Sequence, residues 1–301
     1  MKVFTPSEYE WRGTRLARFI ARYGYGSLDQ LQDDAEIDVS SFWDRVVEEI
    51  DLEWVTRYEK TLDLSSGVMW PRWFVGGELD LIDNVVGKHA RSVPDKIAIR
   101  WEGDCGEERV VSYSELNDEV ARVAAGLCSL GMGEGDRLGI YMPMIPEAAV
   151  VMLAAASIGV VSVPMFSGYS ADSVAERLDD AGASILVCAN GYFRRGKSVD
   201  MLTDALIAAD RAKSVRHVVV VDRLGSGVVR RTRHSTRYGM LDYGSLVSTP
   251  SGTPEKRSFP PDQTLMLIYT SGTSGKSKGV AHTHSGFPLK SAHDIAMAFD
   301  M

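Results

Sequence analysis

The sequence has few cysteines, and no two of them have the spacing of a metal or redox site. Its three cysteines are Cys105, Cys128 and Cys188, and none belongs to a CxxC motif. This scarcity argues against a disulfide framework and a cysteine-ligated zinc site, and it favours a reducing, cytoplasmic location. An excess of basic charge is also missing. The formal net charge of -8 argues against a general nucleic-acid-binding protein.

Long apolar segments are almost absent as well. No apolar run follows the first residues, so we expect no signal peptide. Residues 148–171 contain no charged side chain and have the length of a membrane span, but Gly159, Pro164 and Gly168 interrupt them. We therefore interpret this stretch as a buried helix followed by a buried strand, and we expect no membrane partner.

Tryptophan is absent from the last two thirds of the chain. All six tryptophans lie within the first 101 residues: Trp11, Trp43, Trp54, Trp70, Trp73 and Trp101. This asymmetry marks a distinct N-terminal extension, which we place at residues 1–86. Residues 39–50 have apolar side chains at helical spacing, so the extension is predicted to be mostly helical, with a loop-like segment around residues 70–77.

From residue 112 onward, helical and strand patterns alternate regularly. Ser112 and Glu115 form a capping box, and Gly131 stands where a C-terminal cap is expected. Helices are predicted over residues 113–130, 146–158, 172–180 and 199–209, and strands over residues 137–142, 160–165, 183–188, 215–221 and 265–268. This alternation predicts an α/β fold with a mainly parallel sheet and helices on its faces.

A loop rich in glycine, hydroxyl groups and lysine follows the last predicted strand, at residues 270–279. Backbone N–H groups, hydroxyls and ammonium groups in such a loop suit a polyphosphate. A Walker A motif requires glycine five positions before Gly275, where Thr270 stands, so that interpretation fails. A flexible linker is the alternative, but a linker seldom lies directly between two apolar segments.

Residues 269–280, with sequence YTSGTSGKSKGV, resemble the phosphate-binding motif of the AMP-forming adenylating enzymes. Residues 71–77, 135–147, 166–170 and 191–197 are similar to segments of the acetyl-CoA synthetase branch of that family. The resemblance therefore covers the chain from about residue 30 to its end. It departs from the family at Ser277, where proline is frequent.

The resemblance implies an AMP-forming acid–CoA ligase that uses ATP, CoA and Mg²⁺ to convert a small carboxylic acid into a thioester. It implies that the loop binds the ATP phosphates. Lys278 stands at a position where the family nearly always has lysine, and Lys276 stands at a variable position. The phosphate-binding residues are then Thr270, Ser271, Gly272, Thr273, Ser274, Gly275, Lys276, Lys278 and Gly279.

For CoA, the resemblance implies Gly168 at the nucleotide portion and Arg194 and Lys197 near the phosphates. A basic turn before a helix is the alternative interpretation of Arg194 and Lys197. Another pair, His282 and His284, has strand spacing that suits a metal, but no third ligand is apparent, so packing is the favoured interpretation. No metal site is expected in this chain.

Residues 87–301 are expected to be an incomplete AMP-binding domain, since family members are about twice as long as this chain. The small C-terminal domain and its catalytic lysine are absent from these residues, so no catalytic residue is assigned. Two hypotheses stay open. The chain is part of a working ligase, completed by further sequence or by a second chain, or it is a non-catalytic remnant that binds nucleotide or CoA.

Overall fold

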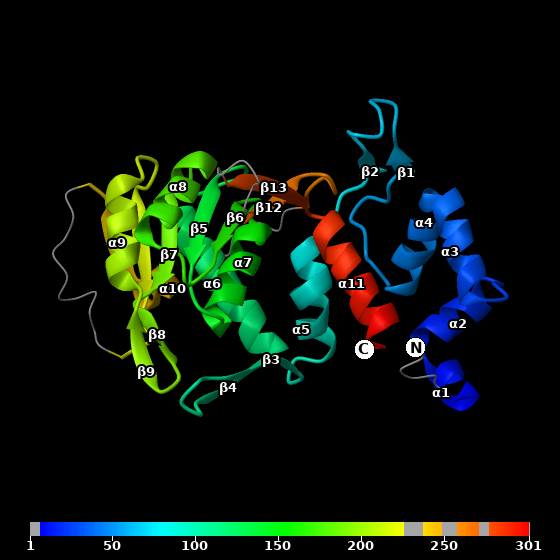
Figure 1. Cartoon of the computed structure of the whole chain (residues 1–301), viewed down its shortest axis with the longest axis horizontal. Coiled ribbons are helices and arrows are strands. Elements are labelled where there is room, and N and C mark those ends of the chain that lie inside the picture. The colour runs from blue at the N-terminus through cyan, green and yellow to red at the C-terminus, as the bar shows by residue number, and fades with distance from the viewer. Residues whose placement is uncertain (1–6, 226–236, 249–257, 271–276, 301) are drawn as a thin grey trace. The chain divides into compact units, whose positions relative to one another are not determined.

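A computed structural model describes residues 7–225, 237–248, 258–270 and 277–300. The chain packs as two compact units (Figure 1). The first unit consists of Met1–Leu79, Ser258–Gln263 and Thr283–Met301, and the second of Asp80–Arg257 and Thr264–His282. Within the described ranges, no helix combines the length and the apolar character that are needed to cross a bilayer.

The first unit is mostly helical. Its helices are α1 (Glu8–Gly13), α2 (Arg15–Arg22), α3 (Leu28–Ile37), α4 (Val39–Glu49) and α11 (Gly286–Ala298). Aromatic side chains dominate its core, where Phe19 and Phe74 are fully buried. Helix α11 joins this core through Leu289 and Met297, and its His293 ring packs edge-on and tilted against two aromatic rings of α4. The first unit therefore includes the last helix of the chain.

A short antiparallel hairpin completes the first unit. It pairs β1 (Lys60–Asp63) with β2 (Arg72–Val75), and Leu62 lies opposite Trp73. The prediction of a loop-like segment at residues 70–77 was therefore wrong for Arg72–Val75. Its pairing partner, Lys-Thr-Leu-Asp, carries a single apolar side chain, so the sequence gives no alternating pattern from which to recognise this hairpin.

The second unit contains a seven-stranded sheet in the order β11-β10-β7-β5-β6-β12-β13. These strands are β5 (Arg137–Tyr141), β6 (Val161–Met165), β7 (Ile185–Ala189), β10 (His217–Val221), β11 (Gly239–Asp242), β12 (Thr264–Thr270) and β13 (Lys278–Thr283). Each recorded pairing from β11 through β12 is parallel. The predicted α/β fold with a mainly parallel sheet is confirmed.

Helices cover both faces of this sheet. They are α6 (Tyr113–Ser129), α7 (Pro146–Ser157), α8 (Ala171–Ala181), α9 (Leu202–Arg211) and α10 (Tyr243–Val247). Val219 of β10 belongs to the core formed with α6 and α7, whereas its neighbours Val218 and Val220 belong to the core formed with α8 and α9. This alternation explains why the central strands are apolar on both faces.

Smaller elements complete the second unit. They are the π-helical turn η1 (Asp83–Gly87), α5 (Lys88–Ser92), and the hairpins β3 (Ile97–Glu102)–β4 (Glu108–Ser112) and β8 (Gly191–Arg194)–β9 (Lys197–Asp200). The predicted helix over residues 199–209 begins only at Leu202. Residues 199 and 200 belong to β9 instead, and the Asp200 carboxylate accepts the amide hydrogen bond of Leu202 at 2.9 Å.

Candidate functional site

The proposed phosphate loop connects two adjacent strands, β12 and β13. Thr270 ends β12, Lys278 begins β13, and both are exposed, as is Gly279. The other six predicted phosphate-binding residues, Ser271, Gly272, Thr273, Ser274, Gly275 and Lys276, lie outside the described residues. Strand β12 runs parallel to β6, so the loop begins at the edge where the parallel strands end, which is the usual ligand edge of such sheets.

Tyr269 packs against β13, the strand that follows this loop (its exit strand). A Cβ atom added to Gly279 would lie 3.3 Å from the Tyr269 ring, so the glycine allows close packing here. The Tyr269 hydroxyl donates a hydrogen bond to the Asp180 carboxylate at 2.7 Å. The pKa of the Tyr269 hydroxyl is raised, mainly by burial and next by the hydrogen bond to Asp180, so the hydroxyl stays neutral. The predicted role of Gly279 in phosphate binding stays a prediction.

Arg177 of α8 contacts Ser277, the residue just before this exit strand, and was not recognised from the sequence. Its guanidinium donates to the Ser173 carbonyl at 2.7 Å and to the Ser277 hydroxyl at 2.8 Å. It also lies over the Tyr169 ring, 4.3 Å from the centroid. One signal was available: Arg177 falls on the helix face that also carries Val174 and Leu178, which are core positions.

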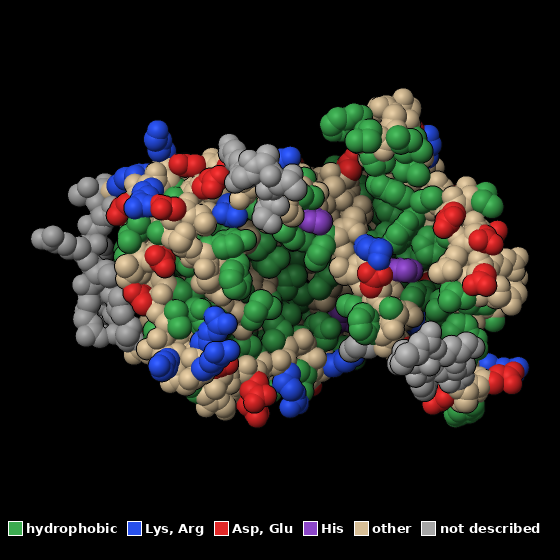
Figure 2. Space-filling model, viewed as in Figure 1, with side chains coloured by type: hydrophobic (Ala, Val, Ile, Leu, Met, Phe, Trp, Pro, Cys, Tyr) green, Lys and Arg blue, Asp and Glu red, His purple; other side chains and the backbone are tan. Residues whose placement is uncertain are grey.

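The predicted CoA residues Arg194 and Lys197 face each other across the β8–β9 hairpin. The two-residue turn between them has positive φ angles, 53° at Arg195 and 74° at Gly196, as a type I′ turn requires. The Arg195 amide donates to the Asp104 carboxylate at 2.8 Å. This basic turn precedes α9, so both the predicted CoA role and the alternative of a basic turn before a helix stay predictions. It brings two exposed cations together, and Figure 2 shows Lys and Arg side chains gathered on that region of the second unit.

The base of this hairpin is braced by Arg223. Its guanidinium lies 5.0 Å from the Trp101 ring centroid and 5.3 Å from that of Phe193, and it donates to the Glu107 carboxylate at 2.8 Å. The hydrogen bond from Arg223 is the main reason that the pKa of Glu107 is lowered. The bulky Phe193 therefore has a packing role, since it holds the hairpin against Arg223.

Gly168 lies in the segment that follows β6. A Cβ atom added there would lie 2.6 Å from the ring of Phe166, a side chain that is 64% exposed. The Tyr141 hydroxyl fixes the segment by donating to the Tyr169 carbonyl at 2.8 Å. Because β6 is the neighbour of β12, Gly168 follows the strand next to the phosphate loop. The Arg194–Lys197 hairpin follows β7, which β5 separates from β6.

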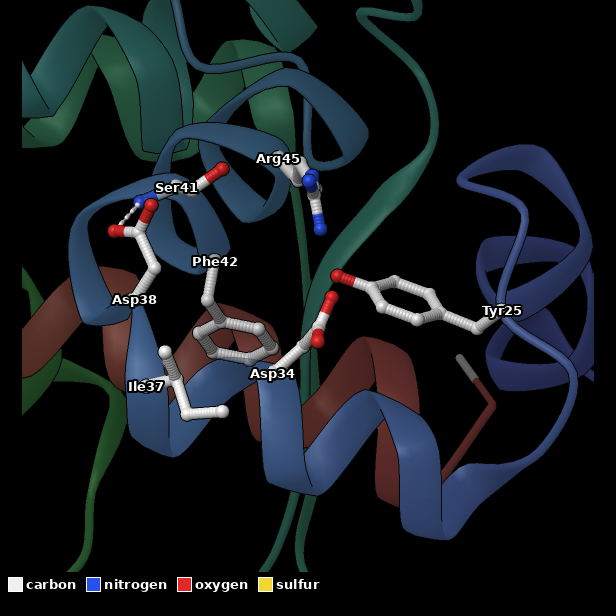
Figure 3. Close-up of a pocket in the computed structure, with 7 residues that line it drawn as sticks. All are labelled: Tyr25, Asp34, Ile37, Asp38, Ser41, Phe42 and Arg45. Carbon is white, nitrogen blue, oxygen red and sulfur yellow. Dashed lines mark hydrogen bonds between the residues drawn. The ribbon is translucent and has the colours of Figure 1, made fainter.

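The first unit contains a cavity whose lining is more acidic than basic (Figure 3). It has a volume of about 140 Å³ and is lined by Tyr25, Asp34, Ile37, Asp38, Ser41, Phe42 and Arg45. Asp38 accepts a hydrogen bond from the Ser41 amide at 3.0 Å. Two carboxylates against a single guanidinium do not suit a polyphosphate, so this cavity is not the predicted nucleotide site.

His284 is a packing residue of the first unit. It is 1% exposed, and its ring centroid lies 5.1 Å from that of Phe259. Both ring nitrogens are buried and have no hydrogen-bond partner among the described residues. Burial lowers the pKa of His284 to about 4. Across the residues that the structure describes, no group of three or more His, Cys, Asp or Glu side chains is arranged to hold a metal ion.

Comparison with known proteins defines the class to which this fold and loop belong. The family model described as AMP-binding enzyme matches residues 86–300, and the one described as acetyl-coenzyme A synthetase N-terminus matches residues 28–85. The chain therefore belongs to the AMP-binding enzyme family, in its acetyl-CoA synthetase-like branch.

Individual relatives agree with this assignment. An acetyl-CoA synthetase of Mycobacterium tuberculosis is 38% identical over 276 residues, which are 90% of this chain and 41% of the relative. One from Deinococcus radiodurans is 36% identical over 303 residues, covering 100% of this chain and 44% of the relative. The solved acetoacetyl-CoA synthetase from Streptomyces lividans superposes with a TM-score of 0.89 at 26% identity, over 100% of this chain and 46% of that one. The chain thus spans less than half the length of these relatives.

Proposed function

We propose that this chain supplies the polyphosphate-binding and CoA-phosphate-binding side of an AMP-forming acid–CoA ligase. The observation that carries the proposal is the position of the loop at residues 270–279. It leaves β12 at the carboxyl edge of the parallel sheet and returns through the exposed Lys278. Residues 87–301 would form this part of the AMP-binding domain, and residues 1–86 the extension of the acetyl-CoA synthetase branch.

The chemistry explains why such a loop is needed. A carboxylate resists nucleophilic attack because it is negatively charged. In the proposed reaction, a carboxylate oxygen attacks the α-phosphorus of ATP, and the bond from that phosphorus to the bridging oxygen breaks, which releases pyrophosphate. The CoA thiolate then attacks the acyl carbon and displaces AMP. Backbone N–H groups, loop hydroxyls and Lys278 would stabilise the charge on the departing β and γ phosphates.

Mg²⁺ would neutralise further phosphate charge in that reaction. Magnesium is bound mainly by substrate phosphates, a few carboxylates and water. The described residues offer no acidic cluster for it. We propose that magnesium would arrive bound to the ATP phosphates, while this chain would provide the loop hydroxyls and Lys278.

The β8–β9 hairpin would bind CoA through its phosphates. Arg194 and Lys197 are exposed cross-strand partners; Asp104 accepts a hydrogen bond from the turn, and Arg223 packs on Phe193 in the same hairpin. An arginine beside a lysine provides both directional hydrogen bonds and a point charge for a phosphate. A short carboxylic acid is the proposed acyl substrate, in agreement with the names of the relatives.

A second candidate function is binding without catalysis. It is favoured by one observation, that Lys278, Arg194 and Lys197 are exposed cations that suit phosphate binding by themselves. In this case the loop and hairpin would bind nucleotide or CoA without turnover.

Titration of the chain with magnesium–ATP tests the proposal. We expect saturable binding, and we expect Lys278→Ala to raise the dissociation constant by about tenfold or more, the loss typical of a charged hydrogen bond. Lys276→Ala should have a smaller effect. Lys213→Ala removes an exposed lysine that follows α9 and serves as the matched control. Equal affinities for wild type and Lys278→Ala in isothermal titration calorimetry would refute the assignment of the loop.

A further inference from the structure

Arg177 is a buried cation that no described carboxylate neutralises. The residue is 7% exposed, and the structure records no ion pair for it within the described residues. Its recorded polar partners are the Ser173 carbonyl and the Ser277 hydroxyl, while Nε is buried and unpaired. Aromatic rings occupy two further positions, with the centroids of Tyr169 and Tyr269 at 4.3 and 5.7 Å from the guanidinium carbon.

This environment leaves the charge only partly compensated. Burying an arginine without a carboxylate is unfavourable, and neutral oxygens and ring faces offset only part of the lost hydration. The nearby carboxylate of Asp180 accepts a hydrogen bond from Tyr269. The positive potential of the Arg177 guanidinium would therefore stabilise an anion that binds close to it.

The contact with Ser277 places this charge at the exit of the phosphate loop. Ser277 directly precedes Lys278, the first residue of β13. In the family that the motif resembles, proline is frequent at this position, and proline restricts the backbone through its fixed φ angle. Here a hydrogen bond from a buried guanidinium at 2.8 Å restrains the same position by another means.

We propose that Arg177 is a positioning residue for polyphosphate, which anchors the loop exit through Ser277 and contributes a partly compensated positive charge next to it. This inference rests on the proposed function, because it takes residues 270–279 as the polyphosphate site. It assigns two separable roles to one side chain. The anchor acts through the Ser277 hydroxyl, and the charge acts over a longer range, so each role can be removed by a different substitution.

The test measures binding of magnesium pyrophosphate to the 301-residue chain at several salt concentrations. Ser277→Ala should weaken binding about tenfold, the loss expected for a hydrogen bond to a charged group. Ser277→Pro should restore the affinity to within about twofold of wild type, because proline restrains the backbone without the hydrogen bond. Arg177→Met should weaken binding further and reduce its dependence on salt, since it also removes the charge. Ser173→Ala, which keeps the carbonyl that Arg177 uses, is the control.

The possible failures are distinguishable. A wild-type chain that binds no pyrophosphate contradicts the proposed function, and the proposal for Arg177 with it. A wild type that binds, together with a Ser277→Ala variant of equal affinity, overturns the anchoring role alone. Unchanged salt dependence in Arg177→Met overturns the charge role. If Arg177→Met does not fold, Ser277→Ala and Ser277→Pro still decide the anchoring, because both leave the buried arginine in place.

Discussion

A polypeptide of these 301 residues is expected to show no acetate-dependent exchange of pyrophosphate into ATP. The chain spans 41% of the acetyl-CoA synthetase of M. tuberculosis, and by the family resemblance the contacts for adenine, ribose and the acyl group lie in sequence beyond these residues. A loop that stabilises the departing pyrophosphate does not by itself orient the carboxylate for attack, and orientation accounts for about 7–11 kcal/mol of catalysis.

Labelled pyrophosphate provides the measurement, with a full-length acetyl-CoA synthetase as the positive control. We expect incorporation at the background level for the purified chain, with and without acetate. Acetate-dependent incorporation above background would show that these residues already form a complete adenylation site. That result would contradict both the partial-site account and the non-catalytic alternative.

The stability of the first unit is expected to fall as the pH is lowered from about 6.5 toward 4, because His284 is buried in its neutral form. Its pKa is lowered to about 4 in the folded chain, whereas an unfolded histidine titrates near 6.5. Between these values the unfolded chain binds a proton that the folded chain does not, so acid favours unfolding. The gap corresponds to roughly 3 kcal/mol, which is fully lost only below the folded pKa.

Thermal or urea unfolding across this pH range, followed by tryptophan fluorescence, measures the effect. His284→Leu replaces the ring by an apolar side chain and should flatten the acid branch of the stability curve. His282→Gln, a half-buried neighbour on β13, is the control and should leave the acid branch in place. An acid branch of the same size in His284→Leu and wild type would exclude His284 as its origin.

The parallel sheet and its helices were predictable because each depends on short-range patterns. The capping box of Ser112 and Glu115 is present in the structure, with the Ser112 amide donating to the Glu115 carboxylate at 2.8 Å. Pro146 is the first residue of α7, as its fixed φ angle suggested. Strand β7 is buried along its whole length, so its apolar run identified it directly.

The hairpins were not predicted because their short strands lack a clear alternating pattern, and the support of the loop was not predictable because it depends on residues distant in sequence. The β8–β9 hairpin has a turn of Arg195 and Gly196, and only the pairing of both strands makes this turn distinct from a basic loop. Arg177 reaches Ser277 across 100 positions of sequence. The family motif identified residues 270–279, but no local pattern shows which distant side chain fixes that loop.

Hydrogen exchange with and without magnesium–ATP locates the bound nucleotide on the chain, and therefore tests whether residues 270–279 bind its phosphates. Mass spectrometry of peptides that cover residues 265–284 should show slower exchange when ATP is present. Peptides from residues 25–45, which line the cavity of the first unit, should be unchanged. Protection of residues 25–45 without protection of residues 265–284 would contradict the account, since the nucleotide would then bind away from the loop.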